Sequence, residues 1–209
     1  MIKILIADDH AIVRQGLKNI VAEDEQMTVV GEARNGAELL NFLREQPADV
    51  VILDRSMPGG NGLETLKNLK RNYQNLPVII LSIHPEDQYA VRAFKAGAAG
   101  YMTKESAPEE LVEAIKKAFR GGKYISPQVA ELLAEYIETK TTGEAHKILS
   151  DREFEVFNLL ASGKTVGQIA AELNLSVKTI STYRTRILEK MGFETNAELT
   201  RYALDFKIL

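Results

Sequence analysis

The chain has 209 residues, of which 45% are hydrophobic and 26% charged, and its formal net charge is −3. These values are typical of a globular protein with one large or two small domains. The chain contains no cysteine, which excludes a disulfide framework, a cysteine metal site and a thiol nucleophile. No apolar run reaches the roughly 20 residues that span a bilayer, and the amino terminus lacks a signal-peptide pattern. We therefore expect a cytoplasmic protein with no membrane partner.

The first 120 residues alternate between short apolar runs and amphipathic segments. The runs predict strands at 2–7, 28–33, 50–54, 78–82 and 99–102. The segments between them predict helices at 11–21, 37–44, 63–71, 85–96 and 106–120, the last opened by a capping box from Ser106 to Glu109. Strict alternation predicts an α/β fold in which a doubly wound, five-stranded parallel sheet is covered by helices.

Strand signals end after Gly121 and Gly122, and the rest of the chain is predicted to be all-α. A helix is expected at 127–138, followed by a polar linker from Thr139 to His146. Four further helices are expected at 151–161, 166–173, 177–191 and 195–206, the first opened by a second capping box at Ser150. We therefore divide the chain into residues 1–125, a helix and linker at 126–146, and a second domain at 147–209.

Polar residues end several of the predicted strands. Asp8 and Asp9 follow the first strand, Asp54 ends the third, and Ser82 and Lys104 follow the fourth and fifth. Because the carboxyl ends of parallel strands share one edge of a sheet, these groups should converge there. An isolated Asp54 would more often be a turn residue, but a cluster has a more specific meaning.

Three neighbouring carboxylates repel one another unless a cation lies among them or their pKa values rise. Oxygen ligands with room for water suit Mg²⁺. A carboxylate beside Mg²⁺ can attack a phosphoryl group to form an aspartyl phosphate, whose oxygens Lys104 and the metal would neutralise. Ser82 is placed to hydrogen-bond the same oxygens.

Residues 1 to about 125 resemble the receiver domain of bacterial two-component response regulators. The resemblance is carried by Asp8-Asp9, by Leu53-Asp54 followed by Met57-Pro58-Gly59, by Ser82, and by Tyr101 three residues before Lys104. It implies that a sensor histidine kinase phosphorylates Asp54. It also implies that Asp9, Asp54 and the Ser56 carbonyl bind Mg²⁺, with Asp8 acting through water, and that Ser82 and Tyr101 form a switch pair.

The sequence departs from this family pattern at two positions. Glu105 follows Lys104 where many receivers have proline, and Ile83 stands where a small residue is common. An enzymatic alternative, a phosphatase of the haloacid dehalogenase class, would need a second aspartate two residues after the nucleophile. That residue is Ser56, so we do not expect an enzyme.

In the second domain, the short helix at 166–173 and the longer helix at 177–191 have the spacing of a helix-turn-helix, whose second helix enters the DNA major groove. Ile180, Ile187 and Met191 should pack inward. The opposite side carries polar residues that can reach bases and phosphates. By periodicity alone, a solvated polar face is an equally good interpretation.

Residues 149–204 resemble the LuxR-type DNA-binding domain, through Leu149 to Glu153, Gly163-Lys164, Ile169-Ala170, Leu175-Ser176 and Lys178-Thr179-Ile180. Together the two resemblances indicate the NarL/FixJ family of response regulators, and Thr182-Tyr183-Arg184 and Glu198-Leu199-Thr200 are similar to its GacA/UvrY branch. The resemblance implies DNA contacts at Lys178, Thr179, Ser181, Thr182, Thr185 and Arg186. For Arg184 a phosphate contact and a salt bridge stay open.

The second domain is nearly neutral, with nine Lys and Arg against eight Asp and Glu in residues 147–209. One copy should therefore bind DNA weakly, and two copies on an inverted repeat far more tightly. The family mechanism implies that phosphorylation favours a homodimer that regulates transcription. The rival hypothesis is a DNA-binding protein whose receiver is an interaction module that is never phosphorylated.

Overall fold

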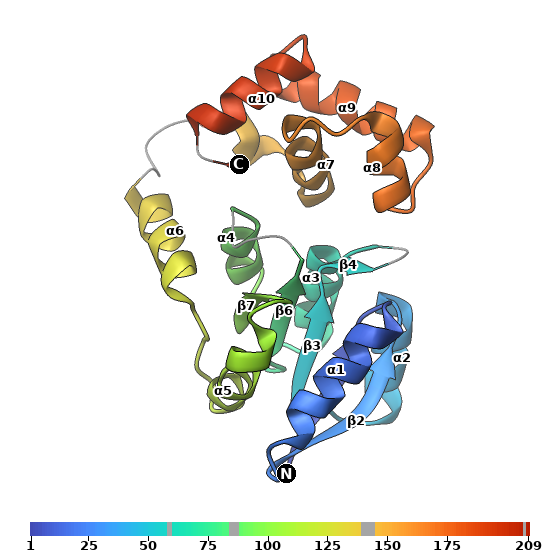
Figure 1. Cartoon of the computed structure of the whole chain (residues 1–209), viewed down its shortest axis with the longest axis vertical. Helices are drawn as coiled ribbons and strands as arrows, with labels where there is room; N and C mark the ends of the chain where they lie inside the picture. The colour runs from blue at the N-terminus through green and yellow to red at the C-terminus, as the bar shows by residue number, and fades with distance from the viewer. Residues whose placement is uncertain (58–59, 84–87, 139–144, 207) are drawn as a thin grey trace. The chain divides into compact units, whose positions relative to one another are not determined.

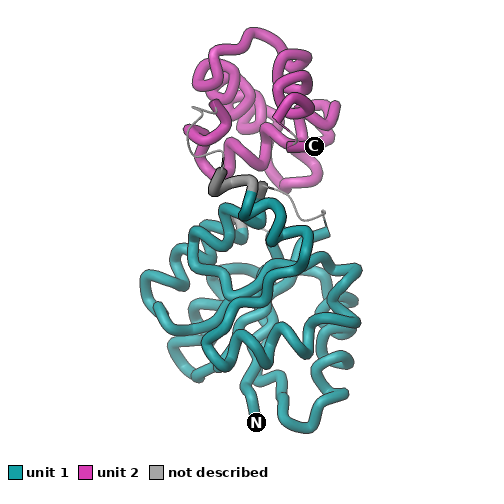
Figure 2. The backbone as a smooth tube through the Cα atoms, turned by 90° about the vertical axis from the view of Figure 1, so that its left-hand side faces the viewer, with its two compact units in different colours: residues 1–134 teal, residues 135–209 magenta. Residues whose placement is uncertain are grey.

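The computed structural model describes residues 1–57, 60–83, 88–138, 145–206 and 208–209. It forms two compact units, Met1–Ala134 and Glu135–Leu209, drawn in different colours in Figure 2. Helix α6 (Pro127–Glu138) contains the boundary between them. Among the described residues, no helix is both long and apolar enough to cross a membrane.

The first unit is built on a parallel sheet. Its strands are β1 (Ile2–Ala7), β2 (Met27–Ala33), β3 (Val50–Asp54), β6 (Val78–Ser82) and β7 (Gly100–Thr103), in the order β2-β1-β3-β6-β7. Every residue of β3 and β6 is buried, which is why these strands are continuous apolar runs rather than alternating ones. The predicted five-stranded sheet is confirmed. After β3, the short strands β4 (Ser56–Met57) and β5 (Gly60–Asn61) pair as an antiparallel ribbon.

Helices cover both faces of the sheet (Figure 1). Helices α1 (Ala11–Ala22) and α5 (Ala107–Phe119) contact each other and enclose one apolar core with the strands. On the other face, α3 (Gly62–Asn72) lies between α2 (Gly36–Glu45) and α4 (Gln88–Lys95). The start expected for α4, at Pro85, lies outside the described residues.

The capping box expected at the start of α5 is absent. Ser106 has helical backbone angles, φ −81° and ψ −15°, and its side chain makes no capping hydrogen bond. An N-cap needs extended backbone to direct its oxygen at the next turn. The Ser106 hydroxyl instead donates to the Thr103 carbonyl, at 3.4 Å.

The second unit is helical. It contains a short 3₁₀ helix, η2 (Ala145–Ile148), followed by α7 (Asp151–Ala161), α8 (Val166–Glu172), α9 (Val177–Met191) and α10 (Asn196–Asp205). The capping box at Ser150 is confirmed, and Thr165 and Thr195 form two more. Each box satisfies backbone N–H groups that a helix start leaves without partners.

The predicted linker differs from the structure at its end. Residues 139–144 lie outside the described part of the chain, but His146, which we placed in the linker, is buried within η2. Its Nδ1 lies 3.0 Å from the Tyr202 hydroxyl, and its ring packs edge-on against Phe206. The sequence did not predict the burial of His146, because the residue lies among polar residues and a single buried side chain leaves no periodic hydrophobic pattern.

Candidate functional site

Strand register brings the predicted acidic cluster together at one edge of the sheet. Ala7 pairs with Leu53, so that Asp8 and Asp54 follow side by side. On the next strands, Leu81 pairs with Asp54, and Thr103 pairs with Ser82. Lys104 is therefore anchored next to β6, where its backbone N–H donates to the Ser82 carbonyl at 2.7 Å.

Lys104 joins the two buried carboxylates. Its Nζ lies 2.7 Å from Asp8 Oδ2 and 3.1 Å from Asp54 Oδ1. Asp8 is 1% and Asp54 2% exposed. One ammonium group shared by two buried carboxylates leaves excess negative charge at the strand ends, so the pocket favours a further cation.

Burial and charge shift the protonation equilibria of this cluster. Burial, reinforced by the negative charge of Asp8, raises the pKa of Asp54 to about 6, while Lys104 and the Ser56 backbone N–H oppose the rise. Burial lowers the pKa of Lys104, but the nearby Asp54 and Asp8 outweigh it and the net shift is upward. At neutral pH the pocket thus holds an ionised Asp54 and a protonated Lys104.

The donor set fits a divalent metal ion. One ligand atom from each of Asp8, Asp9, His10 and Asp54 lies within 4.8 Å of the others. The second oxygen of Asp54, Oδ2, is buried and has no hydrogen-bond partner among the described residues. A buried carboxylate oxygen left in this state is costly, and a cation would satisfy it.

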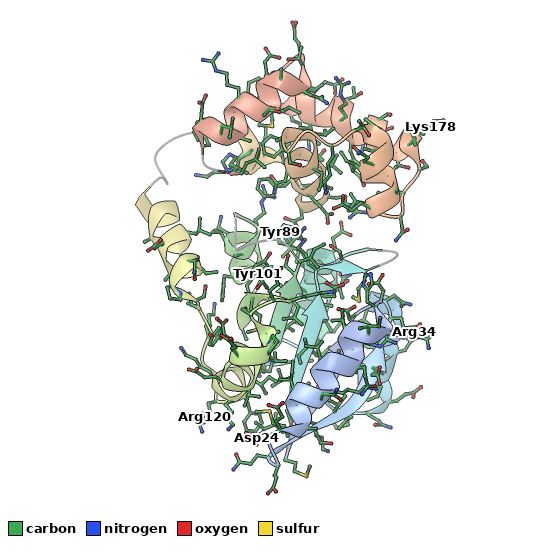
Figure 3. The ribbon with its side chains drawn as sticks, viewed as in Figure 1. Asp24, Arg34, Tyr89, Tyr101, Arg120 and Lys178 are labelled. Atoms are coloured by element: carbon green, nitrogen blue, oxygen red, sulfur yellow. The ribbon has the colours of Figure 1, made fainter. Side chains whose placement is uncertain are left out.

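The remaining predicted receiver residues occupy neighbouring positions. Ser56 lies two residues after Asp54, and its backbone N–H hydrogen-bonds the Asp54 carboxylate. Ser82 ends β6 and is fully buried, as is Tyr101 on β7, which Figure 3 labels within the first unit. The peptide bond between Lys104 and Glu105 is trans. Ile83 is 65% exposed.

Three residues that sequence reasoning missed support the cluster. Arg14 is buried on α1, donating from Nη1 to the Asp8 carbonyl at 2.7 Å and from Nε to Glu32 at 2.8 Å. Gly62 packs so closely on the turn after β3 that an added Cβ would meet the Asp54 carbonyl oxygen at 2.8 Å. The third is His10. Its position directly after Asp8 and Asp9 could have indicated from the sequence alone that it lies at the cluster.

In the second unit, α8 and α9 form the expected helix-turn-helix geometry. The turn uses Asn174 in the left-handed region, φ 52°, and the Leu175 N–H donates to the Ala170 carbonyl at 2.9 Å. Ser176 caps α9 by accepting from the Thr179 N–H at 3.0 Å. Ile180 and Ile187 are fully buried beneath the helix, which fixes the side that α9 presents outward.

The outward side of α9 carries most of the predicted DNA-contacting residues. Five of them are exposed: Lys178, Ser181, Thr182, Thr185 and Arg186. Figure 3 labels Lys178 at the edge of the helical unit. Thr179 differs, because it is half-buried and its hydroxyl lies 2.8 Å from the capping Ser176 hydroxyl. Thr179 therefore takes part in starting the helix.

Arg184 joins two helices. Its Nε donates to Asn196 Oδ1 of α10 at 2.7 Å. The sequence left open a phosphate contact or a salt bridge, and the structure shows a hydrogen bond to a neutral amide. This bond ties the middle of α9 to the start of α10.

Comparison with known proteins identifies the family of each domain. Residues 4–116 match the family model of the response regulator receiver domain, and residues 147–203 match that of bacterial regulatory proteins of the luxR family. The matched segments contain the acidic cluster and α9, respectively.

Full-length relatives share this combination. The response regulator UvrY of Escherichia coli K12 is 37% identical over 98% of this chain and 94% of its own length, and the response regulator GacA of Pseudomonas aeruginosa is 40% identical over 98% and 96%. Among solved structures, RcsB from Salmonella enterica serovar Typhimurium, bound to the promoter P1flhDC with the phosphomimetic BeF₃⁻, is 33% identical over 96% of this chain and 97% of that chain, with a TM-score of 0.66. The chain belongs to the response regulators that carry a LuxR-type regulatory domain.

Proposed function

We propose that this protein regulates transcription under the control of phosphorylation at Asp54 by a sensor histidine kinase. The observation that carries the proposal is the pocket itself, in which a buried aspartate has one oxygen on Lys104 and the other without a partner among the described residues. In the proposed transfer, an Asp54 oxygen forms a bond to phosphorus while the P–N bond of a phosphohistidine breaks. The histidine nitrogen keeps the electron pair of that bond.

The other pocket residues bind and stabilise the phosphoryl group. Asp8, Asp9, Asp54 and Ser56 would hold Mg²⁺, which supplies positive charge beside the transferred group. Lys104 neutralises a phosphoryl oxygen, because its ammonium already lies 3.1 Å from the acceptor carboxylate. Ser82, buried at the end of the adjacent strand, donates a hydrogen bond, and Tyr101 reports the change as the second switch residue.

The helical unit binds DNA through α9. Lys178 and Arg186 neutralise phosphates, while Ser181, Thr182 and Thr185 reach base edges. Thr179 contributes mainly through its contact with the capping residue Ser176 at the start of the helix. The relative RcsB has been solved on a promoter, and a further RcsB structure contains two dimers on two DNAs, which supports binding as a homodimer. We place the protein in the cytoplasm because its DNA partner is there.

A regulator fits this chain better than a phosphatase. The position two residues after Asp54 holds Ser56, which has no carboxylate to protonate a leaving group. Its backbone N–H contacts the Asp54 carboxylate. Phosphoryl transfer to Asp54 is therefore an input to DNA binding rather than a step in turnover of a substrate.

The proposal can be tested by measuring the intact mass of the full chain after incubation with Mg²⁺ and a phosphodonor. The donor is acetyl phosphate in one experiment and a phosphorylated sensor kinase in the other. Wild type and the control Asp205→Ala should gain one phosphoryl group, and Asp54→Ala none. Asp205 is an exposed aspartate in the other unit. Phosphorylated wild type should then sediment as a dimer and bind DNA more tightly. Modification of Asp54→Ala, or none of wild type with either donor, would overturn the proposal.

A further inference from the structure

His10 lies at the acidic pocket but has no role in the function proposed above. Its Nδ1 lies 2.8 Å from Asp9 Oδ1 and 3.4 Å from Asp8 Oδ1. The backbone N–H of the same residue donates to Asp8 Oδ1 at 2.8 Å. That bond sets the turn between β1 and α1 and places His10 next to Asp8, with its side chain largely exposed.

His10 Nδ1 and Asp9 Oδ1 form an ion pair when the imidazole ring is protonated. Asp9 Oδ1 has no hydrogen-bond partner among the described residues, although His10 Nδ1 lies at 2.8 Å. When the ring is neutral with its proton on Nε2, Nδ1 and Asp9 Oδ1 are both electron-pair donors and are placed to share a cation. Ligand atoms on opposite sides of an ion with bonds of about 2.1 Å lie about 4.2 Å apart. The four donor atoms of the pocket lie within 4.8 Å, close to that span.

Two further observations point to a ligand at this position. Asp54 is 2% exposed, and it contributes one carboxylate oxygen to the same group of donor atoms. Its Oδ2 has no hydrogen-bond partner within the described ranges. The charges also favour a cation. Three carboxylates and the ammonium of Lys104 leave two negative charges, which one divalent ion balances while a neutral imidazole adds a donor without adding charge.

We propose that His10 is a metal ligand through Nδ1, and that it strengthens the binding of first-row transition-metal ions relative to Mg²⁺. Imidazole is a good ligand for transition metals and a poor one for Mg²⁺, for which oxygen and water are preferred. The inference rests on the proposed metal site and deepens it. With His10 as a ligand, the identity of the bound ion depends on one exposed ring beside the phosphoacceptor.

The test compares wild type with His10→Ala and His84→Ala, using Mn²⁺ and Mg²⁺ as probes on the full chain. The His10 side chain is 66% exposed, and alanine keeps the backbone N–H that bonds Asp8, so the variant should fold. Electron spin-echo measurements on bound Mn²⁺ detect coupling to a ligand nitrogen. Calorimetric titrations give the affinity for each ion.

We expect nitrogen coupling in wild type and in His84→Ala, and its loss in His10→Ala. Affinity for Mn²⁺ should fall about tenfold or more in His10→Ala, while affinity for Mg²⁺ should change less than about threefold. If both ions bind but nitrogen coupling is absent from wild type or survives in His10→Ala, the inference fails and the metal site stands. If wild type binds neither ion, the proposed metal site itself is wrong.

Discussion

The two functional regions differ in how their residues depend on one another. In the receiver pocket, Lys104 Nζ lies within 3.1 Å of the buried carboxylates of Asp8 and Asp54, and both Asp8 and Lys104 shift the pKa of Asp54. On α9, the exposed Lys178, Thr182 and Arg186 sit on a helix fixed from beneath by buried aliphatic residues. A buried cluster should lose function when one member changes, whereas an exposed helix face should lose it in small, nearly additive steps.

The largest effect should follow removal of the shared cation. Lys104→Met leaves Asp8 and Asp54 without their ammonium and removes the group that neutralises the phosphoryl oxygens. We expect phosphorylation of Asp54 to slow by about 100-fold or more, measured as the time course of intact mass with acetyl phosphate. Lys116→Met is the matched control, because Lys116 forms an ion pair with Asp24 on the surface. Equal phosphorylation rates for Lys104→Met and the control would show that phosphorylation of Asp54 does not depend on Lys104.

The second effect concerns the energetic cost of holding Asp54 ionised. Its pKa is about 6 in the folded protein against 3.8 ordinarily, so the folded state binds the proton more tightly than the unfolded state. In metal-free buffer, Asp54→Asn should be no more stable than wild type below about pH 4. As the pH rises through 6, the free energy of unfolding of Asp54→Asn should come to exceed that of wild type by about 3 kcal/mol.

This stability difference can be measured by calorimetry of the receiver transition at pH 4 and pH 7.5. Asp205→Asn, at an exposed aspartate, should show no such trend. A gain for Asp54→Asn that is the same at both pH values would contradict the pKa argument, because it would reflect a change in packing rather than loss of charge.

The parts of the receiver predicted correctly are those set by sequence period and strand order. The run from Val50 to Leu53 is apolar because both faces of β3 are buried, and an aspartate directly after it must lie at the sheet edge. The convergence of Asp8, Asp54 and Lys104 followed from this alone. The exact register was not needed, because all parallel strands end on the same edge.

The sequence did not predict features that depend on backbone angles or on the direction of one side chain. Ser106 has the residue type of an N-cap, but helical φ and ψ turn its oxygen away from the α5 N–H groups. Thr179 lies among residues expected to face DNA, yet its hydroxyl contacts Ser176. Arg14 is a charged residue on a helix, buried because it can donate both to a backbone carbonyl and to Glu32.

The contrast between the two serines gives a third, smaller prediction. The Ser150 hydroxyl oxygen accepts a hydrogen bond from the Glu153 N–H, and the Ser150 backbone N–H donates one to the Glu153 carboxylate. Because Ser150→Ala breaks this capping box, it should destabilise the helical unit by about 1 kcal/mol. Ser106→Ala removes a hydroxyl that caps nothing and should cost the receiver clearly less. Thermal unfolding of both variants measures the difference. A larger loss for Ser106→Ala would contradict the assignment of the caps.

The smallest effects separate two arginines that lie two residues apart on α9. Arg186 is exposed on the outward side, so Arg186→Ala should leave stability within about 0.5 kcal/mol of wild type but lower DNA affinity. The slope of log affinity against log salt should decrease in magnitude by about 0.9, the value for one phosphate contact. Fluorescence anisotropy at several KCl concentrations measures this slope.

Arg184 should show the opposite pattern. It is half-buried, and its guanidinium donates to Asn196, so Arg184→Ala should destabilise the helical unit by about 1 kcal/mol and leave the salt slope unchanged. Asn196→Ala should reproduce that loss, and the double variant should lose little more than either alone, because both remove the same hydrogen bond. A salt slope lowered equally by Arg184→Ala and Arg186→Ala would mean that both side chains contact phosphate. In that case the bond to Asn196 would have to break on DNA, and the face of α9 that binds DNA would be wider than its exposed residues indicate.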